Sequence, residues 1–302
     1  MPSFSPFSGL WIPMVTPFLD DAVDHAALAR LVKHFVAAGV DGFVACGSTG
    51  EAAALSPAEQ LAVLDTVLQA SAGRPVVMGL SGYHLGETLA WVHTLASYPI
   101  AGLLVPPPHY IRPSQAGLQH WFTALADAAD QPLIVYDIPY RTGSQLTLDT
   151  LLALAAHPNI RAIKDCGGDP GKTQALIADG RLQVLAGEDA QIFTTLALGG
   201  VGAIAASAHL CTAQFVAVLR CLQAGQLQQA RQLWHPPGAT DPGGICRAQP
   251  GLDQVRPGTT GSVTRRVASA DDGGQQRRRP AHAGGAGTAK PKPCGGLRSN
   301  RR

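Results

Sequence analysis

Three features are missing from this 302-residue chain, and each absence argues against a class of protein. No run of about 18 apolar residues occurs, which argues against a membrane-spanning helix. The six cysteines form no CxxC pair and no His/Cys cluster at zinc spacing, so neither a disulfide framework nor a structural metal site is indicated. The N-terminus lacks the basic start and apolar stretch of a signal peptide. We therefore expect a cytoplasmic protein without a membrane partner.

Residues 236–302 lack the composition of a folded domain. They contain no Phe, Tyr or Trp, but 13 of the 34 Gly and 8 of the 23 Pro. Their 12 Lys and Arg against 4 Asp and Glu give a net charge of +8, whereas residues 1–235 have 11 against 17 and a net charge of −6. Such a segment buries too little apolar surface to fold. We predict a folded domain over residues 1–235 and a basic, low-complexity, disordered tail over 236–302, with no aromatic residues for stacking on nucleic acid.

The folded part alternates short apolar runs with amphipathic segments of helical length, which is typical of repeated βα units. Strands are expected at 10–15, 42–45, 76–80, 102–105, 133–137, 160–164, 182–186 and 201–205. Helices are expected to begin near Ala26, Pro57, Gly86, Gln115, Leu148, Gly171, Ala190 and Ala213, several of them after an N-cap such as Ser56, Ser114 or Thr147. Eight units predict a TIM (β/α)8 barrel, with an open doubly wound sheet as the alternative.

In a TIM barrel the active site lies where the strands end. Lys164 closes an apolar strand, where burial is expected to lower the pKa of its amine so that it can attack a ketone. A lysine that extends into solvent is the simpler alternative. Tyr136 ends the preceding strand, so its hydroxyl is expected to reach the amine as a proton shuttle. Taken alone, a tyrosine in this position is more often a core residue whose hydroxyl has a hydrogen-bond partner.

A glycine-containing turn follows the second strand, with the sequence Gly47-Ser48-Thr49-Gly50-Glu51. Because glycine has no side chain, the two glycines leave the backbone open to a ligand, and two hydroxyls lie next to the backbone N–H groups. The turn therefore suits a small carboxylate. A plain glycine turn is the alternative, and the spacing and lysine of a nucleotide-binding P-loop are absent. Further polar residues follow other strands and are expected at the same end of the barrel, namely His109, Tyr110, Asp137, Arg141 and Asp165.

Together these segments resemble a known family. The turn at 47–51, the segment Tyr136-Asp137-Ile138-Pro139-Tyr140-Arg141-Thr142-Gly143 and the segment Ile163-Lys164-Asp165 are similar, in order and spacing, to the three signatures of the class I Schiff-base pyruvate lyases. This family includes dihydrodipicolinate synthases, N-acetylneuraminate lyases and keto-deoxy sugar acid aldolases or dehydratases. The opening segment 12–18 resembles the family's first strand, and the resemblance covers about residues 9 to 235.

The resemblance implies a role for individual residues. Lys164 is expected to form a Schiff base with pyruvate, Tyr136 to relay protons, and Ser48 to link Tyr136 to a further tyrosine. Tyr110 is the fourth residue expected to take part in catalysis, because it matches a tyrosine that reaches into a neighbouring subunit's site. This match implies a homo-oligomer, either a dimer or a tetramer. The expected substrate-binding residues are Gly47, Thr49, Arg141 and Ile204.

Arg141, within Arg-Thr-Gly, matches an arginine that binds the second substrate's carboxylate, and with Tyr110 it favours the synthase branch. The implied reaction condenses pyruvate with aspartate semialdehyde to 4-hydroxy-tetrahydrodipicolinate, in lysine and diaminopimelate biosynthesis, with neither a metal nor a cofactor. Two departures leave the substrate open: Ser48 stands where synthases usually have Thr, and His109-Tyr110-Ile111 where Tyr-Tyr-Asn is more usual. The alternatives are a keto-deoxy sugar acid aldolase or dehydratase, and a product that the altered C-terminus leaves inactive.

The tail departs from the family, whose members continue with apolar helices that include a Glu-Pro-Asn-Pro segment. Codons can be chosen for residues 245–251 such that a shift of one base reads Phe-Ala-Glu-Pro-Asn-Pro. This favours a frameshifted remnant of the family's C-terminal helices. A genuine basic extension is the alternative.

Overall fold

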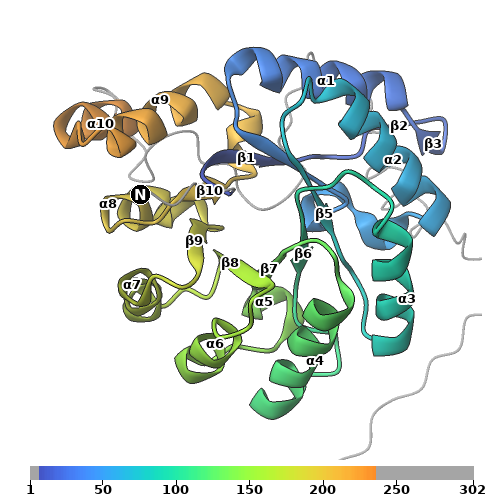
Figure 1. Ribbon diagram of the computed structural model, residues 1–302. Helices are drawn as coiled ribbons and strands as arrows, with labels where there is room; N and C mark the ends of the chain where they lie inside the picture. Colours follow the sequence, from blue (N-terminus) through green and yellow to red (C-terminus); the bar gives the residue numbers. More distant parts are fainter. Residues whose placement is uncertain (1–6, 236–302) are drawn as a thin grey trace, which may run out of the picture.

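The computed structural model describes residues 7–235 of the chain, and the predictions made for residues 236–302 lie outside the described residues. Eight parallel strands close into a barrel, because β1 is hydrogen-bonded to both β4 and β10. The predicted TIM barrel is therefore confirmed, and helices surround the strands (Figure 1). The strands are β1 Gly9–Pro13, β4 Gly42–Ala45, β5 Val76–Gly79, β6 Gly102–Val105, β7 Leu133–Asp137, β8 Ile160–Asp165, β9 Gln183–Ala186 and β10 Gly202–Ile204.

The outer layer follows the predicted helix starts to within two residues. The side chains of Ser56, Ser114 and Thr147 accept hydrogen bonds from the first turns of α2, α4 and α6, which confirms the three predicted N-caps. The helices are α1 His25–Ala38, α2 Pro57–Ala70, α3 Leu85–Leu95, α4 Gln115–Ala128, α5 Pro139–Thr142, α6 Leu148–Leu154, α7 Pro170–Asp179, α8 Ile192–Ala197, α9 Thr212–Gln223 and α10 Leu227–Trp234.

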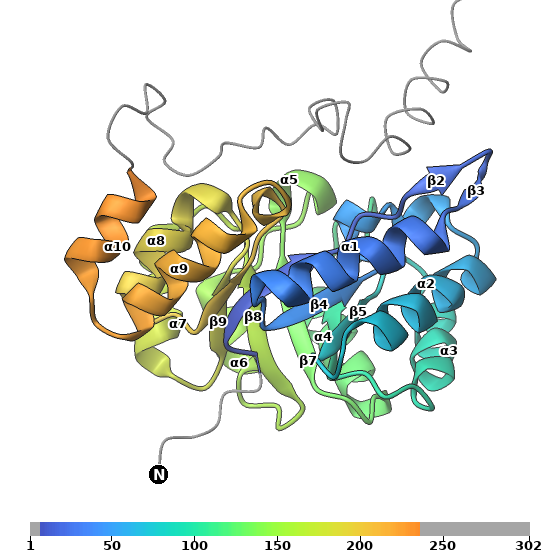
Figure 2. The ribbon, with the colours of Figure 1, turned by 90° about the horizontal axis from the view of Figure 1, so that it is seen from above.

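Three local features differ from the sequence-based expectation. A two-stranded hairpin, β2 Phe18–Leu19 with β3 Ala22–Val23, precedes α1, and the short helix α5 follows β7. The helical pattern that ends at Trp234 is not continuous, because Gly225 has a left-handed backbone (φ 73°) and separates α9 from α10. The two helices then pack side by side, as Figure 2 shows.

The apolar core has two layers. Large aliphatic and aromatic side chains fill the space between the strands and the helices. A smaller cluster that includes Phe7, Trp11 and Tyr136 occupies the inside of the barrel. Trp11 requires a glycine beside it, since a Cβ at Gly42 would lie 2.4 Å from the indole ring. The barrel interior is thus packed with side chains, as expected for this fold.

His209 lies on the turn after β10. Burial lowers its pKa to about 4, a larger decrease than for any other histidine among residues 7–235. Its Nδ1 lies 2.9 Å from the Ala206 carbonyl oxygen, and its ring meets Phe35 edge-to-face with centroids 5.0 Å apart. Because the carbonyl can only accept, Nδ1 carries the proton. The buried Nε2 has no hydrogen-bond partner among the described residues. A second proton on this ring would therefore be an unpaired buried charge.

We expect this histidine to make folding sensitive to acid. The unfolded state binds its proton near pH 6.5 and the folded state only near pH 4, so the free energy of unfolding should decrease as the pH falls through this window. The decrease is about 3 kcal/mol, at about 1.4 kcal/mol per pH unit. Urea unfolding of wild type and His209→Gln between about pH 7 and pH 4 checks this, because glutamine does not titrate. Parallel pH curves for the two proteins would contradict it.

Candidate active site

Three of the four residues predicted to be catalytic, Lys164, Tyr136 and Ser48, come together at the C-terminal end of the barrel. Tyr136 and Lys164 are paired in register on β7 and β8, and their exposed fractions are only 6% and 5%. The Lys164 Nζ lies 4.2 Å from the centroid of the Tyr136 ring. The Tyr136 hydroxyl is 3.4 Å from the Ser48 Oγ. An amine, a phenol and an aliphatic hydroxyl thus form a continuous polar path in an otherwise apolar barrel.

The turn that carries Ser48 is held by contacts on both sides. The Thr16 hydroxyl donates to the Gly50 carbonyl oxygen at 2.7 Å, and a Cβ at Gly50 would lie 2.8 Å from the Met14 carbonyl oxygen. Gly50 is therefore required for close approach to the chain after β1. The left-handed residues of the turn are Cys46 and Glu51, whereas the two glycines keep ordinary φ values. Gly50 is thus needed for close approach, and neither glycine of the turn is needed for a left-handed backbone angle.

Two buried side chains complete the inner wall. Ile204, predicted to bind substrate, belongs to the same interior cluster as Tyr136. Cys166 also belongs to it, and the sequence analysis missed this residue. The signal was available, because residues two apart on a strand share a face and Cys166 follows Lys164 by two. A Cβ at Gly187 would lie 2.3 Å from the Cys166 Sγ and 2.9 Å from the Lys164 Cγ, so the two side chains meet in the space above this glycine.

The direction of the Lys164 pKa shift differs from the expectation. Burial by itself lowers the pKa of this amine, but the Tyr136 phenol, the Cys166 thiol and the Asp189 carboxylate together outweigh burial. The net pKa of Lys164 is raised, and the cation also lies over the Tyr136 ring. Lys164 is thus an ammonium group, which must lose a proton before it can attack a carbonyl. Tyr136 is the nearest hydroxyl on the polar path.

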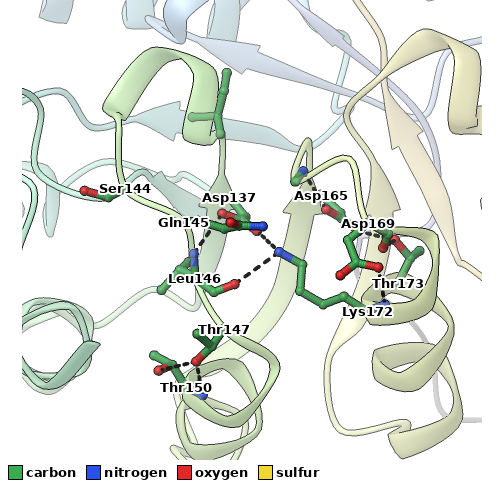
Figure 3. A network of polar contacts seen from close by, with 12 residues as sticks. Asp137, Ser144, Gln145, Leu146, Thr147, Thr150, Asp165, Asp169, Lys172 and Thr173 are labelled. Atoms are coloured by element: carbon green, nitrogen blue, oxygen red, sulfur yellow. Dashed lines mark hydrogen bonds and ion pairs between the residues drawn. The ribbon is translucent and has the colours of Figure 1, made fainter. Parts of the chain in front are cut away.

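Asp137 and Asp165 do not line the site, although both follow catalytic candidates in sequence. Successive residues of a strand point to opposite faces, so each aspartate turns outward where Tyr136 and Lys164 turn inward. Asp137 accepts a hydrogen bond from Lys172, and Asp165 accepts one from Thr173, both on α7 (Figure 3). The two aspartates thus lie at the predicted end of the barrel, but on its outer face, away from Tyr136 and Lys164.

The outer residues of the site lie on loops. Arg141 is exposed on α5, and Gly143 ends this helix with φ 70°. Tyr110 is 93% exposed in a single chain and is not part of the polar path formed by Lys164, Tyr136 and Ser48. The neighbouring Tyr140 hydroxyl donates to the Glu188 Oε1 at 2.7 Å and so connects the loops after β7 and β9. This contact was missed because nothing local in the sequence pairs residues 48 positions apart.

Two further properties bear on the chemistry of the described residues. Residues 7–235 contain no group of three or more His, Cys, Asp or Glu side chains arranged to hold a metal ion. Within the same residues, no helix has the length and apolar character needed to cross a bilayer.

Burial raises the pKa of Cys166 to about 12, so its thiol is neutral at physiological pH. The nucleophile that these residues offer inside the barrel is therefore the amine of Lys164.

Known proteins share both the sequence and the fold. The 4-hydroxy-tetrahydrodipicolinate synthase of Limosilactobacillus fermentum is 40% identical over 226 residues, which are 73% of this chain and 72% of that protein. The synthase of Sorangium cellulosum is 38% identical over 232 residues, 75% and 77% of the two chains. The crystal structure of the chloride-inhibited dihydrodipicolinate synthase from Acinetobacter baumannii, complexed with pyruvate, matches with a TM-score of 0.72 and 33% identity, over 75% of this chain and 79% of that one.

The sequence model of the dihydrodipicolinate synthetase family matches residues 6–236, which include the whole described part. The chain belongs to the dihydrodipicolinate synthetase family.

Proposed function

We propose that this chain condenses pyruvate with aspartate semialdehyde to 4-hydroxy-tetrahydrodipicolinate. The observation that carries the proposal is the buried Lys164 amine, 4.2 Å from the Tyr136 ring, with the Tyr136 hydroxyl 3.4 Å from Ser48. This arrangement suits covalent catalysis through an imine, which needs a desolvated amine and a nearby group that moves protons. The relatives named as synthases of this product support the choice of substrates.

The proposed mechanism begins with a proton relay, in which the Tyr136 hydroxyl accepts a proton from the Lys164 ammonium while its own proton passes through Ser48 to solvent. The free amine attacks the ketone carbon of pyruvate, and Tyr136 returns protons as the carbinolamine loses water. Loss of a methyl proton from the resulting imine gives an enamine, whose carbon attacks the aldehyde of the second substrate and regenerates an imine to Lys164. The amino group of the second substrate then attacks this imine carbon, which closes the ring, and the bond to Lys164 breaks to release the product and the free amine. Tyr136 and Ser48 supply the path for each proton, because they are the hydroxyls next to the amine.

Substrate binding is proposed on the residues around this path. The turn Ser48–Gly50, with Gly47 before it, offers backbone N–H groups and the Thr49 hydroxyl to the carboxylate of pyruvate. Ile204 contributes apolar contact from β10. Arg141 is exposed at the mouth, where its guanidinium group suits the carboxylate of aspartate semialdehyde. Neither a metal nor a cofactor has a part in the scheme.

We also propose a homo-oligomer in the cytoplasm. Tyr83, Tyr110 and Ile111 are 65%, 93% and 54% exposed, and the backbone N–H of His109 donates to the Gly82 carbonyl oxygen, which places their two loops next to each other. Such apolar exposure suits contact with a second copy. Sedimentation of the purified chain tests for a dimer or a tetramer.

The deciding experiment is turnover by the full-length chain. We expect product formation from pyruvate plus aspartate semialdehyde, and no release of pyruvate from keto-deoxy sugar acids. Cleavage of a sugar acid without condensation would replace the proposed reaction by the aldolase or dehydratase alternative. A folded chain inactive in both assays would be the product that the altered C-terminus leaves inactive, and resequencing the gene would then test the frameshift.

A further inference from the structure

A buried polar network joins the strands of the two proposed catalytic residues to α7. Lys172 donates one hydrogen bond to the Asp137 Oδ2 and another, of 3.1 Å, to the Leu146 carbonyl oxygen (Figure 3). The Leu146 N–H donates to the Asp137 Oδ1 at 3.4 Å. Beside this group, the Thr173 hydroxyl donates to Asp165. We call these five residues the α7 network.

The register of the barrel connects this network with the active site. Tyr136 is paired with Lys164, and Asp137 with Asp165, one position further along the same two strands. The inward pair carries the proposed chemistry, and the outward pair is bound by consecutive residues of α7. Any shift of α7 against these strand ends therefore displaces the phenol and the amine as well.

The Asp137–Lys172 ion pair is a costly way to stabilise a protein. The exposed fractions of the two side chains are 0% and 4%, so both charges are removed from water. Burial raises the pKa of Asp137, although Lys172 opposes the rise. Replacing a buried ion pair by apolar side chains of similar volume is often neutral or stabilising. Stability alone thus gives no reason for charges at this place.

The surrounding chain is also shaped to fit the pair. A Cβ at Gly167 would lie 2.6 Å from the Lys172 Nζ and 2.7 Å from the Asp137 Oδ2. The loop after β8 therefore closes directly over the pair, and a larger residue would push the two groups apart. The Gly167 N–H also donates to the Asp165 Oδ1 at 2.8 Å. Both strand ends and the covering loop are held by the same few polar atoms.

From this geometry we propose that Lys172 is a positioning residue, which fixes the end of β7 through Asp137 and Leu146 and so holds the Tyr136 hydroxyl in reach of the Lys164 amine. Lys172 does not touch substrate, because its amine is bound on the outer face of the barrel. The inference rests on the proposed roles of Tyr136 and Lys164. Proton transfer requires hydrogen-bond distance, and a displacement of about 1 Å can reduce a rate about 100-fold.

The test compares two variants. Lys172→Met keeps an unbranched side chain but removes the hydrogen-bond donor. The double variant Lys172→Met/Asp137→Asn also removes the carboxylate that the single variant leaves unpaired. We expect both to lower kcat and the rate constant of borohydride trapping with pyruvate by about 10- to 100-fold, with KM for pyruvate within about 3-fold of wild type. The melting temperature should recover in the double variant, whereas the trapping rate should not. Arg181→Met, which breaks an exposed ion pair with Asp179, is the matched control.

Each outcome decides the question. A double variant that traps pyruvate at the wild-type rate would overturn the inference and leave the proposed function intact. A double variant that does not fold would show that the pair serves folding, and would also overturn it. Wild type that forms no adduct at Lys164 would instead overturn the proposed catalytic roles, and this inference with them.

Discussion

Lys164→Ala is expected to abolish covalent capture of pyruvate and to lower kcat by about 10⁴- to 10⁶-fold, the range seen when a catalytic nucleophile is removed. Wild type treated with pyruvate and borohydride should gain a stable mass on the peptide that contains Lys164. The reason is specific to this side chain, because it is the described lysine that lies inside the barrel against Tyr136. Intact-protein and peptide mass spectrometry measure the adduct.

The other lysines of the described residues supply the controls for this experiment. Lys33 is exposed on α1, so Lys33→Ala should form the adduct like wild type. Lys172 is buried but bonded to Asp137 and the Leu146 carbonyl oxygen, so it should carry no label. An adduct that persists in Lys164→Ala, on either residue, would show that the nucleophile has been assigned wrongly. Circular dichroism establishes that the variant is folded.

The barrel strands were predictable because both of their faces are buried. A parallel strand covered by helices on one side and by the barrel interior on the other reads as a continuous apolar run. The bounds of β4, β6 and β7 agree with the predicted ranges 42–45, 102–105 and 133–137. The break between α9 and α10 was harder to predict, since one glycine in a helical pattern is often tolerated.

The sequence identified the side chains of the active site, but it did not predict the groups that surround them. Lys164, Tyr136 and Ser48 stand out as polar residues at strand ends, and the structure brings them together. The pKa of Lys164 could not be predicted from its own strand, because Tyr136 and Asp189, two of the groups that raise it, come from other segments. Long-range contacts decide such properties.

The α7 network also depends on long-range contacts that the sequence does not reveal. Alternation along β7 and β8 predicts that Asp137 and Asp165 point outward once Tyr136 and Lys164 point inward. Their partners could not be named, because Lys172 lies 35 residues after Asp137, near the start of a mainly polar helix. Only the closed barrel places α7 against both strand ends.

Tyr136→Phe is expected to lower kcat by about 100- to 1,000-fold while leaving the fold unchanged. Removing a proton-transfer group costs this much when no other group takes over. Phenylalanine keeps the ring beneath the Lys164 amine and removes only the hydroxyl, which lies 3.4 Å from the Ser48 Oγ. The variant therefore separates proton transfer from packing.

The measurements are kcat, KM for pyruvate and the rate constant of borohydride trapping. The decrease should appear in kcat and in the rate constant of trapping, because the Tyr136 hydroxyl acts on protons that move only during the reaction. The KM for pyruvate should stay within about 3-fold of wild type. Ser48→Ala should have a smaller effect, below about 10-fold, since water can replace a hydroxyl on the exposed side of the path. Tyr98→Phe, remote from the site after α3, is the matched control. If Tyr136→Phe keeps wild-type rates, the proton must leave Lys164 by a route that avoids Tyr136 and Ser48, and the proposed path is wrong.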